Sequence, residues 1–399
     1  MPARREGMSS RIGVLILTPW YPTPDLPHRG IFVVDQARAL AGAGARVTVL
    51  HPDARPFALR GIYALRGTKV WPSRVEDGVT VLAATRPAFL PRLEIAYACT
   101  SQRLTSRLLA ELPAAPRPDM VHAHVSYPTG AIAVELGRRW RRPVVITEHY
   151  APFSELIARP LARRRALSAL GQADAVVAVS SALARDMAAA GLARPVEVVP
   201  NVVDVSQFQP RPLPPAAPFK VIAIGSLIAR KDPVTILEAA ARLAGDRPEL
   251  GVRVTFVGSG PLERELEQRA QALGLADRVV LTGDLSRPEV ARELAAHHLL
   301  VVASRSETFS VVAAEALASG RPVVSTRCGG PEDFVTPEVG ELIPIGDPAA
   351  MAGAWARWAD RLPATDPHRI AQFAQSRFAP KTVAARLLDL YDRCRTEAR

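Results

Sequence analysis

The sequence has few cysteines and no long apolar run. Cys99, Cys328 and Cys394 are the only three among 399 residues, and they lie far apart. This spacing argues against a disulfide framework and against a thiolate metal site. No apolar stretch approaches the roughly 18 to 20 residues that a transmembrane helix needs, and the run 12–17 is too short for a signal-peptide core. We therefore expect a cytoplasmic protein.

A dinucleotide-binding glycine pattern is also missing. No Gly-x-Gly-x-x-Gly follows the first predicted strand, so a nicotinamide-binding function loses its main support. Extended low-complexity segments are absent, and a content of 48% hydrophobic and 22% charged residues is typical of a globular protein. The length of 399 residues is enough for two domains, each with its own core.

Positive charge is in excess. The chain has 50 Lys and Arg against 39 Asp and Glu, a formal net charge of +11. This excess favours an anionic partner, such as a nucleotide diphosphate, a lipid phosphate, an anionic membrane or a nucleic acid. No pattern of interleaved aromatic and basic residues supports a nucleic acid, so we expect none. An ordinary solvated basic surface would explain the charge equally well.

Short apolar runs alternate with longer helical patterns along the chain. The runs are residues 12–17, 47–50, 79–82, 120–122, 144–146, 175–179, 220–225, 254–257, 279–281, 298–302 and 323–324. Their alternation with helices predicts an α/β protein with βαβ units and parallel sheets covered on both faces. Ligands of such sheets bind beyond the carboxyl ends of the strands.

A proline-rich segment, 210–218, is the clearest linker in the chain. We therefore predict an N-terminal domain over residues 1–204, a linker over 205–218 and a C-terminal domain over 219–380.

The stretch 304–332 carries the densest set of functional signals. Thr308 is the predicted N-cap of a helix that ends at Gly320. Glu307 and Glu315 lie roughly 12 Å apart at helical rise, so they would hold two ends of a long ligand. Between them, the unpaired N–H groups of the helix start form a site for a phosphate-type anion. A nucleotide sugar carries its hydroxyls and its diphosphate in this order.

These two carboxylates also have an ordinary interpretation, as solvated or helix-dipole residues. Glu315, however, lies among Ala, Val and Leu. An unpaired carboxylate is costly there, so we expect Glu315 to have a dedicated partner.

The same stretch resembles a known family. Glu307-Thr308-Phe309, the run from Glu315 to Val324 and Gly329-Gly330 with Glu332 resemble the donor-binding segment of glycosyltransferase family 4, also described as glycosyl transferases group 1. The resemblance implies a retaining transferase of the GT-B fold, with two Rossmann-like domains whose parallel sheets face each other across a cleft. It implies no cofactor and no metal, and it predicts that residues 381–399 pack back on the N-terminal domain.

The resemblance extends to two glycine loops of the C-terminal domain. The family has a Lys six residues after the glycine of the first loop, and Lys231 matches that position relative to Gly225. Ser226 stands where the family often has Arg, and we expect Arg230 to supply this charge. Gly258 and Gly260 resemble the nucleotide-side loop. The donor-binding set implied by the family comprises Gly30, Gly225, Arg230, Lys231, Gly258, Gly260, Glu307, Thr308, Phe309, Ser310 and Glu315.

Two segments of the N-terminal half resemble the rest of the family's site. Thr147-Glu148-His149 resembles the segment whose His lies beside the transferred sugar, so His149 is the catalytic candidate there. Arg29 and Gly30 resemble the loop near the donor phosphates and the acceptor. His124 is a further acceptor-side candidate, although a lone His is more often a structural residue. His122 and His124 have metal-ligand spacing, but no carboxylate or thiolate cluster accompanies them.

The family roles define a mechanism. Arg230 and Lys231 would neutralise the charge on the leaving diphosphate, which stabilises the transition state. Glu307 would hold hydroxyls of the transferred sugar and Glu315 the ribose, while His149 would act beside the sugar. We expect a UDP- or GDP-linked donor and a saccharide, lipid-linked or small-molecule acceptor in surface polysaccharide or glycoconjugate synthesis. The alternatives are a nucleotide-sugar 2-epimerase of the same fold and a non-catalytic basic scaffold that binds anions.

Arginine clusters suggest a membrane contact. The densest basic runs are residues 138–142 and 159–167. An apolar edge beside Arg163, Arg164 and Arg165 could come from Leu156, Ile157, Leu161, Leu167 and Leu170. A basic amphipathic helix of this kind binds anionic membrane surfaces. Peripheral attachment to the inner face of the membrane is therefore a hypothesis, and an ordinary solvated helix is the alternative.

Overall fold

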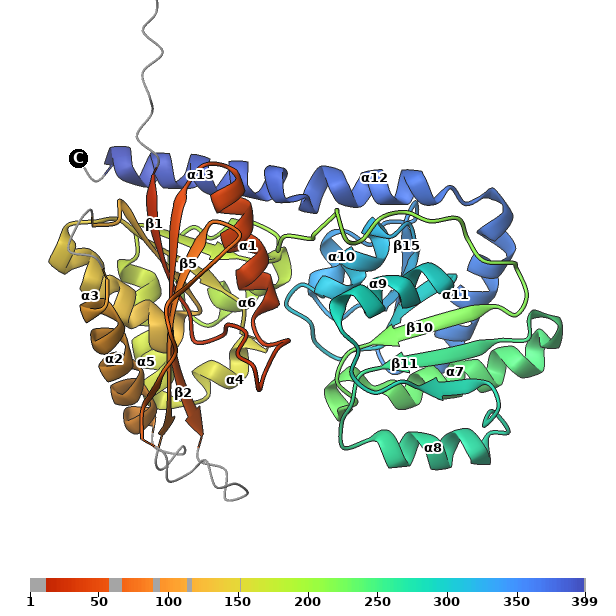
Figure 1. Cartoon of the computed structure of the whole chain (residues 1–399). Helices are drawn as coiled ribbons and strands as arrows, with labels where there is room; N and C mark the ends of the chain where they lie inside the picture. The colour runs from red at the N-terminus through yellow and green to blue at the C-terminus, as the bar shows by residue number, and fades with distance from the viewer. Residues whose placement is uncertain (1–11, 57–66, 89–93, 113–116, 151, 398–399) are drawn as a thin grey trace, which may run out of the picture. The chain divides into compact units, whose positions relative to one another are not determined.

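The structure is a computed structural model that describes residues 12–56, 67–88, 94–112, 117–150 and 152–397. The chain divides into two units (Figure 1). The first comprises Met1–Ala178, Asp186–Val199 and Val383–Arg399, and the second comprises Val179–Arg185 and Pro200–Thr382. Helix α6 (Ser181–Ala189) is shared between them.

The first unit is built on one sheet with the strand order β3-β5-β2-β1-β6-β7-β8-β9, and β4 also pairs with β5. Neighbouring strands are parallel except β3 and β4, which run antiparallel to β5. The strands are β1 (Gly13–Leu17), β2 (Arg46–Pro56), β3 (Lys69–Val70), β4 (Arg74–Glu76), β5 (Val79–Ala88), β6 (Met120–His124), β7 (Val144–Glu148), β8 (Ala175–Ala178) and β9 (Glu197–Val198).

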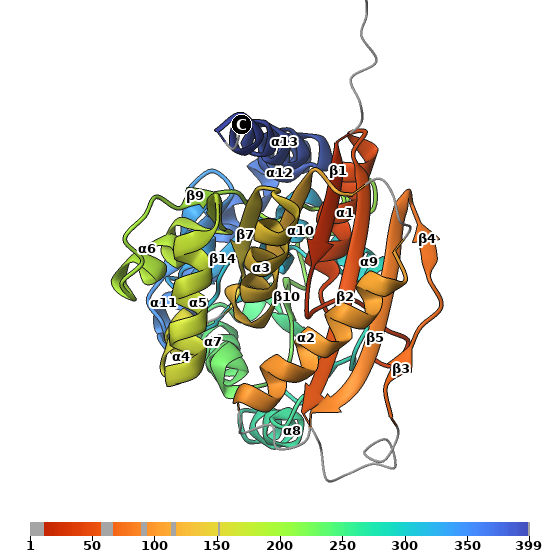
Figure 2. The same ribbon diagram turned by 90° about the vertical axis from the view of Figure 1, so that its left-hand side faces the viewer.

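Helices cover both faces of this sheet because its central strands are apolar on both sides. Helices α2, α3 and α5 lie side by side on one face, as both views show, and α1 lies on the other (Figures 1 and 2). The helices are α1 (Ile31–Gly42), α2 (Glu94–Ala110), α3 (Ala131–Trp140), α4 (Phe153–Ile157), α5 (Pro160–Gln172) and α13 (Pro380–Glu397), with a short π-helical turn, η2 (Ser126–Gly130), before α3.

The second unit contains a fully parallel sheet with the order β12-β11-β10-β13-β14-β15. Its strands are β10 (Lys220–Ile224), β11 (Arg253–Val257), β12 (Val279–Leu281), β13 (Leu299–Val302), β14 (Val323–Thr326) and β15 (Gly340–Ile343). The strand order reverses between β10 and β13, and in open parallel sheets ligands bind beside such a reversal, at the carboxyl ends of the strands.

The helices of the second unit also lie on both faces of their sheet (Figure 1). They are α7 (Pro233–Asp246), α8 (Glu263–Ala272), α9 (Arg287–Ala296), α10 (Val311–Ala318), α11 (Pro348–Arg361) and α12 (Pro367–Phe378), and short 3-10 turns occur at η3 (Ala229–Lys231), η4 (Pro248–Leu250), η5 (Gly330–Asp333) and η6 (Leu362–Ala364). The core contains Trp355 and Trp358, which are fully buried. None of the described helices has the length and hydropathy needed to cross a bilayer.

The start of α10 differs from the prediction. The helix begins at Val311, and its N-cap position is Ser310, so the prediction of Thr308 as N-cap is wrong. Ser310 has a φ of 68°, and this left-handed backbone separates the helix from the preceding residues. The end is confirmed, because Gly320 follows the helix with a φ of 74°.

Two buried histidines join parts of the first unit. His122 on β6 hydrogen-bonds the Tyr391 hydroxyl of α13 through Nδ1 at 2.6 Å and the Thr147 hydroxyl of β7 through Nε2 at 2.7 Å. His51 on β2 bonds the carbonyl of Thr18 at 3.0 Å. Burial disfavours the imidazolium, which lowers the pKa of His122 to about 3 and that of His51 to about 4.

These depressed pKa values predict acid-sensitive folding. Both rings titrate near 6.5 in the unfolded chain, so the unfolded state binds more protons below that pH. The free energy of unfolding should fall as the pH drops from about 6.5 to about 4, by about 1.4 kcal/mol per pH unit for each histidine. Urea unfolding between pH 8 and 5 measures this slope, and His122→Gln should make it shallower. Equal slopes for the parent and the variant would contradict the assignment.

Candidate functional site

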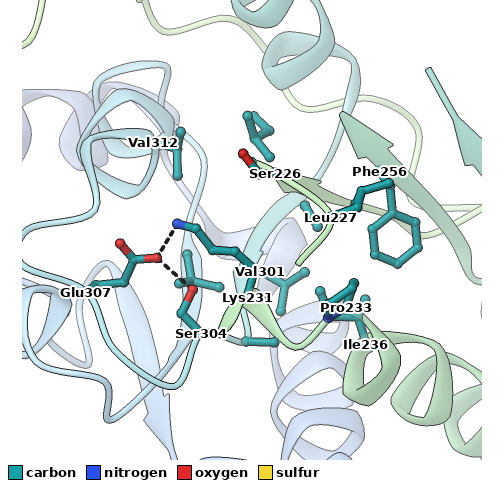
Figure 3. Close-up of a pocket in the computed structure, with 15 residues that line it drawn as sticks. Ser226, Leu227, Lys231, Pro233, Ile236, Phe256, Val301, Ser304, Glu307 and Val312 are labelled. Carbon is teal, nitrogen blue, oxygen red and sulfur yellow. Dashed lines mark hydrogen bonds and ion pairs between the residues drawn. The ribbon is translucent and has the colours of Figure 1, made fainter. Parts of the chain in front are cut away.

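A small hollow lies at the carboxyl ends of β10 and β13 in the second unit (Figure 3). Its volume is about 30 Å³. Its lining includes Gly225 and Ser226 after β10, Lys231 before α7, Glu307 after β13 and Val312 in the first turn of α10. Two glycine-loop residues, a cation, a carboxylate and a helix start therefore meet at one point, where the parallel topology places ligands.

An ion pair between Lys231 and Glu307 borders this hollow (Figure 3). The Lys231 ammonium and the Ser304 hydroxyl both donate to Oε1 of Glu307, the hydroxyl at 2.6 Å. The Glu307 side chain is 9% exposed and that of Lys231 is 26% exposed. The Lys231 side chain thus keeps access to solvent, so a phosphate oxygen can approach it while Ser304 continues to hold Glu307.

The turn that carries Lys231 is tied to the loop that carries Glu307. The Arg305 amide donates to the carbonyl of Arg230 at 2.8 Å, and the Arg230 guanidinium donates to the carbonyl of Ser306 at 3.3 Å. Together with the ion pair, these contacts fix η3 against residues 304–307. Arg230 therefore lies beside the hollow, although it is not part of its lining.

The predicted glycines of the second unit serve backbone packing. Gly258 has a φ of 125°, and a Cβ atom there would lie 2.3 Å from the carbonyl oxygen of Gly225. A Cβ atom at Gly260 would lie 2.4 Å from the carbonyl oxygen of Leu227. The loop after β11 thus presses on the loop after β10. Gly225 lines the hollow, whereas Gly258 and Gly260 pack against the loop that contains Gly225 and Leu227.

The pair Gly329-Gly330 packs in the same way on the loop that carries Glu307. A Cβ atom at Gly330 would lie 2.4 Å from Cα of Phe309, and the Gly330 amide donates to the Glu307 carbonyl at 2.9 Å. The close approach to Gly330 is therefore made by the chain itself. The Phe309 ring is buried against Phe334 and Phe378, so its side chain belongs to the core.

The start of α10 has the features of an anion site. Ser310 provides no side-chain cap, and its hydroxyl is buried without a hydrogen-bond partner. Helix N-termini carry unsatisfied N–H groups and partial positive charge. Val312 of the same turn lines the hollow, which places this charge beside Lys231.

Glu315 has the dedicated partner that its apolar surroundings predict. Arg287, the first residue of α9, donates to Oε1 of Glu315 through Nη2 at 3.0 Å and through Nε at 3.3 Å. Its guanidinium also lies 5.4 Å from the centre of the buried Phe208 ring. Sequence reasoning missed Arg287, because it lies outside every motif and only the fold brings α9 beside α10.

In the first unit, His149 follows β7 and is held by its neighbour Glu148. The Glu148 carboxylate is fully buried and accepts hydrogen bonds from the amides of His149 at 2.8 Å, Tyr150 at 2.9 Å and Ser126 at 2.9 Å. A carboxylate satisfied by backbone amides fixes the loop around it. Glu148 thus determines the backbone position of His149.

Three histidines stack in this region. His149 Nε2 lies 2.9 Å from Nδ1 of His124, and Nε2 of His124 lies 3.3 Å from the amide nitrogen of Gln36 on α1. The ring of His122 stacks on that of His124 at 4.8 Å. Burial lowers the pKa of His149 to about 3 and that of His124 well below its ordinary value. His124 is fully buried, and both of its ring nitrogens are engaged, so it reaches other molecules only through His149.

The other acceptor-side candidate, Arg29, is part of an ion-pair network around a buried carboxylate. Its guanidinium donates to Asp53 at 2.8 Å, and Asp53 is fully buried. Arg55 binds the second oxygen of the same carboxylate. Gly30 has a φ of 73°, and a Cβ atom there would lie 2.3 Å from the carbonyl oxygen of Trp20. The close contact with the loop after β1 therefore accounts for a glycine at position 30.

A second hollow, of about 500 Å³, lies between α3 and α5. Arg138, Arg164 and Arg165 contribute to its lining. The apolar edge predicted for this region is wrong in two positions, since Leu156 and Leu170 are fully buried in the unit's core. Leu161, another residue of that edge, lines the hollow together with the arginines.

Among the described residues, no group of three or more His, Cys, Asp or Glu side chains is arranged to hold a metal ion. The three cysteines are free thiols, of which Cys328 and Cys394 are buried. The spacing of His122 and His124 is used for stacking and hydrogen bonding instead.

Family models match most of the chain. The model described as Glycosyltransferase Family 4 matches residues 30–207, and the model described as Glycosyl transferases group 1 matches residues 218–361. Among solved structures, sucrose-phosphate synthase from Thermosynechococcus elongatus is similar with a TM-score of 0.71 and 19% identity, covering 97% of this chain and 100% of that one. Anabaena Alr3699/HepE in complex with UDP is similar with a TM-score of 0.70 and 20% identity, covering 96% and 100%.

Curated relatives agree with these matches. D-inositol 3-phosphate glycosyltransferase from Thermobispora bispora is 31% identical over 92% of this chain and 90% of that protein. The Arthrobacter protein of the same name is 32% identical over 54% of this chain, and this match spans only about half, 55%, of the relative. A teichuronic acid biosynthesis glycosyltransferase described as putative, TuaC of Bacillus subtilis, is 27% identical over 86% and 88%. The chain therefore belongs to glycosyltransferase family 4, has the GT-B fold and is a glycosyltransferase.

Proposed function

We propose that this protein is a retaining glycosyltransferase that moves a sugar from a nucleotide diphosphate sugar to a glycan, lipid-linked or small-molecule acceptor. The observation that carries the proposal is the meeting of Lys231, Glu307 and the start of α10 at one hollow. These groups are a cation, a hydroxyl-binding carboxylate and a helix N-terminus. Together they match the charge and hydrogen-bonding pattern of a sugar joined to a diphosphate.

The leaving diphosphate would be bound by Lys231 and Arg230. As the bond to the sugar breaks, negative charge grows on the diphosphate, and fixed cations stabilise that charge without a metal ion. Glu307 would accept hydrogen bonds from hydroxyls of the transferred sugar, and Ser304 keeps its carboxylate in position. Glu315 would hold the ribose while Arg287 orients its carboxylate.

The donor base is proposed as uracil or guanine. The solved complex of Alr3699/HepE contains UDP, which supports a uridine nucleotide here. The name of TuaC refers to teichuronic acid biosynthesis, and this supports a role in surface polysaccharide or glycoconjugate synthesis. The acceptor would approach His149 and the loop that carries Arg29.

The first prediction concerns donor binding. UDP or GDP should raise the melting temperature, since a ligand at about 100 times its Kd stabilises the folded state by about 2.7 kcal/mol. Lys231→Met should reduce this shift by removing a cation, and Glu315→Gln should reduce it by weakening the contact to the ribose. Thermal denaturation against UDP, GDP, ADP and their sugars measures the effect.

Lys381→Met is the matched control, because Lys381 is an exposed residue on α13. It should retain the full shift. Absence of any shift in the parent protein at millimolar nucleotide would contradict the proposed donor site and would favour a scaffold that binds anions without catalysis.

The second prediction separates transfer from donor binding. His149→Ala should lower kcat for sugar transfer by about 100- to 1000-fold, the usual cost of losing one hydrogen-bond donor that acts on the transition state. The nucleotide-induced shift should persist, because the diphosphate contacts lie in the second unit. Transfer measured with the donor identified above tests this, and the exposed His368→Ala is the control. A loss of nucleotide binding in His149→Ala would contradict the division of roles.

We also propose peripheral attachment of this cytoplasmic enzyme to an anionic membrane through the cationic surface of α3 and α5. Arg163 and Arg164 on α5 are exposed, and Arg164 and Arg165 line the hollow beside α3. Each Arg near an anionic surface contributes about 1 kcal/mol of attraction. Because Leu156 and Leu170 of the predicted apolar edge are buried, the attachment would depend mainly on charge and be sensitive to salt.

The third prediction follows from this charge. Replacing Arg163, Arg164 and Arg165 with Ala should weaken binding to vesicles that contain anionic lipids by roughly 100-fold, from about 1 kcal/mol for each Arg. Vesicle co-sedimentation at low and high salt measures it. A triple variant of the exposed Arg242, Arg253 and Arg264 in the second unit removes the same charge elsewhere. Equal losses in both variants, or none, would dismiss the proposed surface.

A further inference from the structure

The stacked histidines of the first unit include a hydrogen-bonded pair, His124 and His149. Three neutral imidazoles lie together on β6 and just after β7, and His149 is the catalytic candidate among them. A neutral imidazole carries one proton on one of two nitrogens, and its hydrogen-bond partners determine which nitrogen holds it. The contacts of the chain specify this choice for two of the three rings.

The hydrogen bonds run in one direction from Gln36. The side-chain NH₂ of Gln36 can only donate, so Nε2 of His124, 3.3 Å away, accepts. With Nε2 unprotonated, the single proton of His124 is on Nδ1. This N–H then donates to Nε2 of His149 at 2.9 Å. His149 must therefore carry its own proton on Nδ1.

The series of hydrogen bonds from Gln36 through His124 ends at His149, whose other ring nitrogen is Nδ1. Nδ1 of His149 has no hydrogen-bond partner among the residues that the structure describes, and the residue is 7% exposed. The Phe32 ring lies against it at 4.4 Å and restricts its rotation. Glu148 holds the backbone of the same residue through the His149 amide.

We infer that Gln36 and His124 are positioning residues that fix His149 in the tautomer with its proton on Nδ1. His149 then presents an N–H donor to the substrate and does not present a basic nitrogen. Its partner is an oxygen with free lone pairs, such as a sugar hydroxyl or an anionic oxygen. The consequence for catalysis rests on the proposed role of His149, whereas the tautomer itself does not.

Burial keeps the imidazole rings of His124 and His149 neutral. The pKa of His149 is lowered to about 3, so the ring stays neutral throughout the physiological range. His122 stacks on His124, but its ring nitrogens are paired with Thr147 and Tyr391, so it takes no part in the hydrogen bonds between Gln36, His124 and His149. The tautomer is therefore set by a hydrogen-bonded path that begins at Gln36 on α1 and ends at His149.

Nuclear magnetic resonance of the whole protein labelled with ¹⁵N-histidine tests the inference directly. Two-bond proton–nitrogen correlations distinguish a protonated ring nitrogen from an unprotonated one. The chain has 8 histidines, and loss of one signal set in His149→Gln assigns that residue. We expect a protonated Nδ1 and an unprotonated Nε2 for both His124 and His149. A protonated Nε2 on His149 in the parent protein would overturn the inference without any further variant.

Gln36→Met is the decisive variant, since Met has a similar length but donates no hydrogen bond. Its His149 signals should shift toward a mixture of the two tautomers. The signals of His297 and His298 in the second unit should not move, which controls for intact folding. Sugar transfer should lose about 10- to 100-fold in kcat, less than the roughly 100- to 1000-fold expected for removing a whole donor. The KM for the donor should change little.

The outcomes are separable. Unchanged His149 signals in Gln36→Met would show that Gln36 does not set the tautomer. A mixed tautomer with unchanged kcat would show that this series of hydrogen bonds exists but that transfer does not use it, which refutes the positioning role. If the parent transfers no sugar at all, the proposed function fails while the tautomer remains readable from its resonances.

Discussion

The contact on which the donor site depends is backbone packed against backbone in the second unit. Gly330 leaves no room for a side chain beside Phe309, and its amide bonds the carbonyl of Glu307. This contact fixes the loop after β13, so that Glu307 meets Lys231 from the turn after β10. A glycine contact of the same kind, between Gly258 and Gly225, fixes that first loop. The charged groups are thus held in place by uncharged main chain.

The first unit uses buried polar groups for the same purpose. The Glu148 carboxylate binds three amides of the surrounding loops, and the hydrogen bonds of Gln36 and His124 orient the ring of His149. Such groups are stable only when each is satisfied, because an unpaired polar group in this environment is costly. A side chain held by a satisfied network loses little freedom when a ligand arrives.

The sequence predicted those features that depend on local pattern. Periodicity located the parallel strands, and the surroundings of Glu315 predicted a dedicated partner. The pattern could not identify Arg287 as that partner, because α9 and α10 meet only in the folded sheet. The error at Thr308 has a local cause, since the left-handed backbone of Ser310 delays the helix. Gln36 was missed because it carries no motif and only the fold brings α1 beside His124.

The most direct measurement is a crystal structure of the protein with a bound nucleotide diphosphate. It should place the phosphate oxygens within hydrogen-bonding distance of Lys231 Nζ and of the first amides of α10, with Glu307 still held by Ser304. A nucleotide bound elsewhere, for example among the arginines between α3 and α5, with the hollow beside Lys231 unchanged, would contradict the account of the donor site.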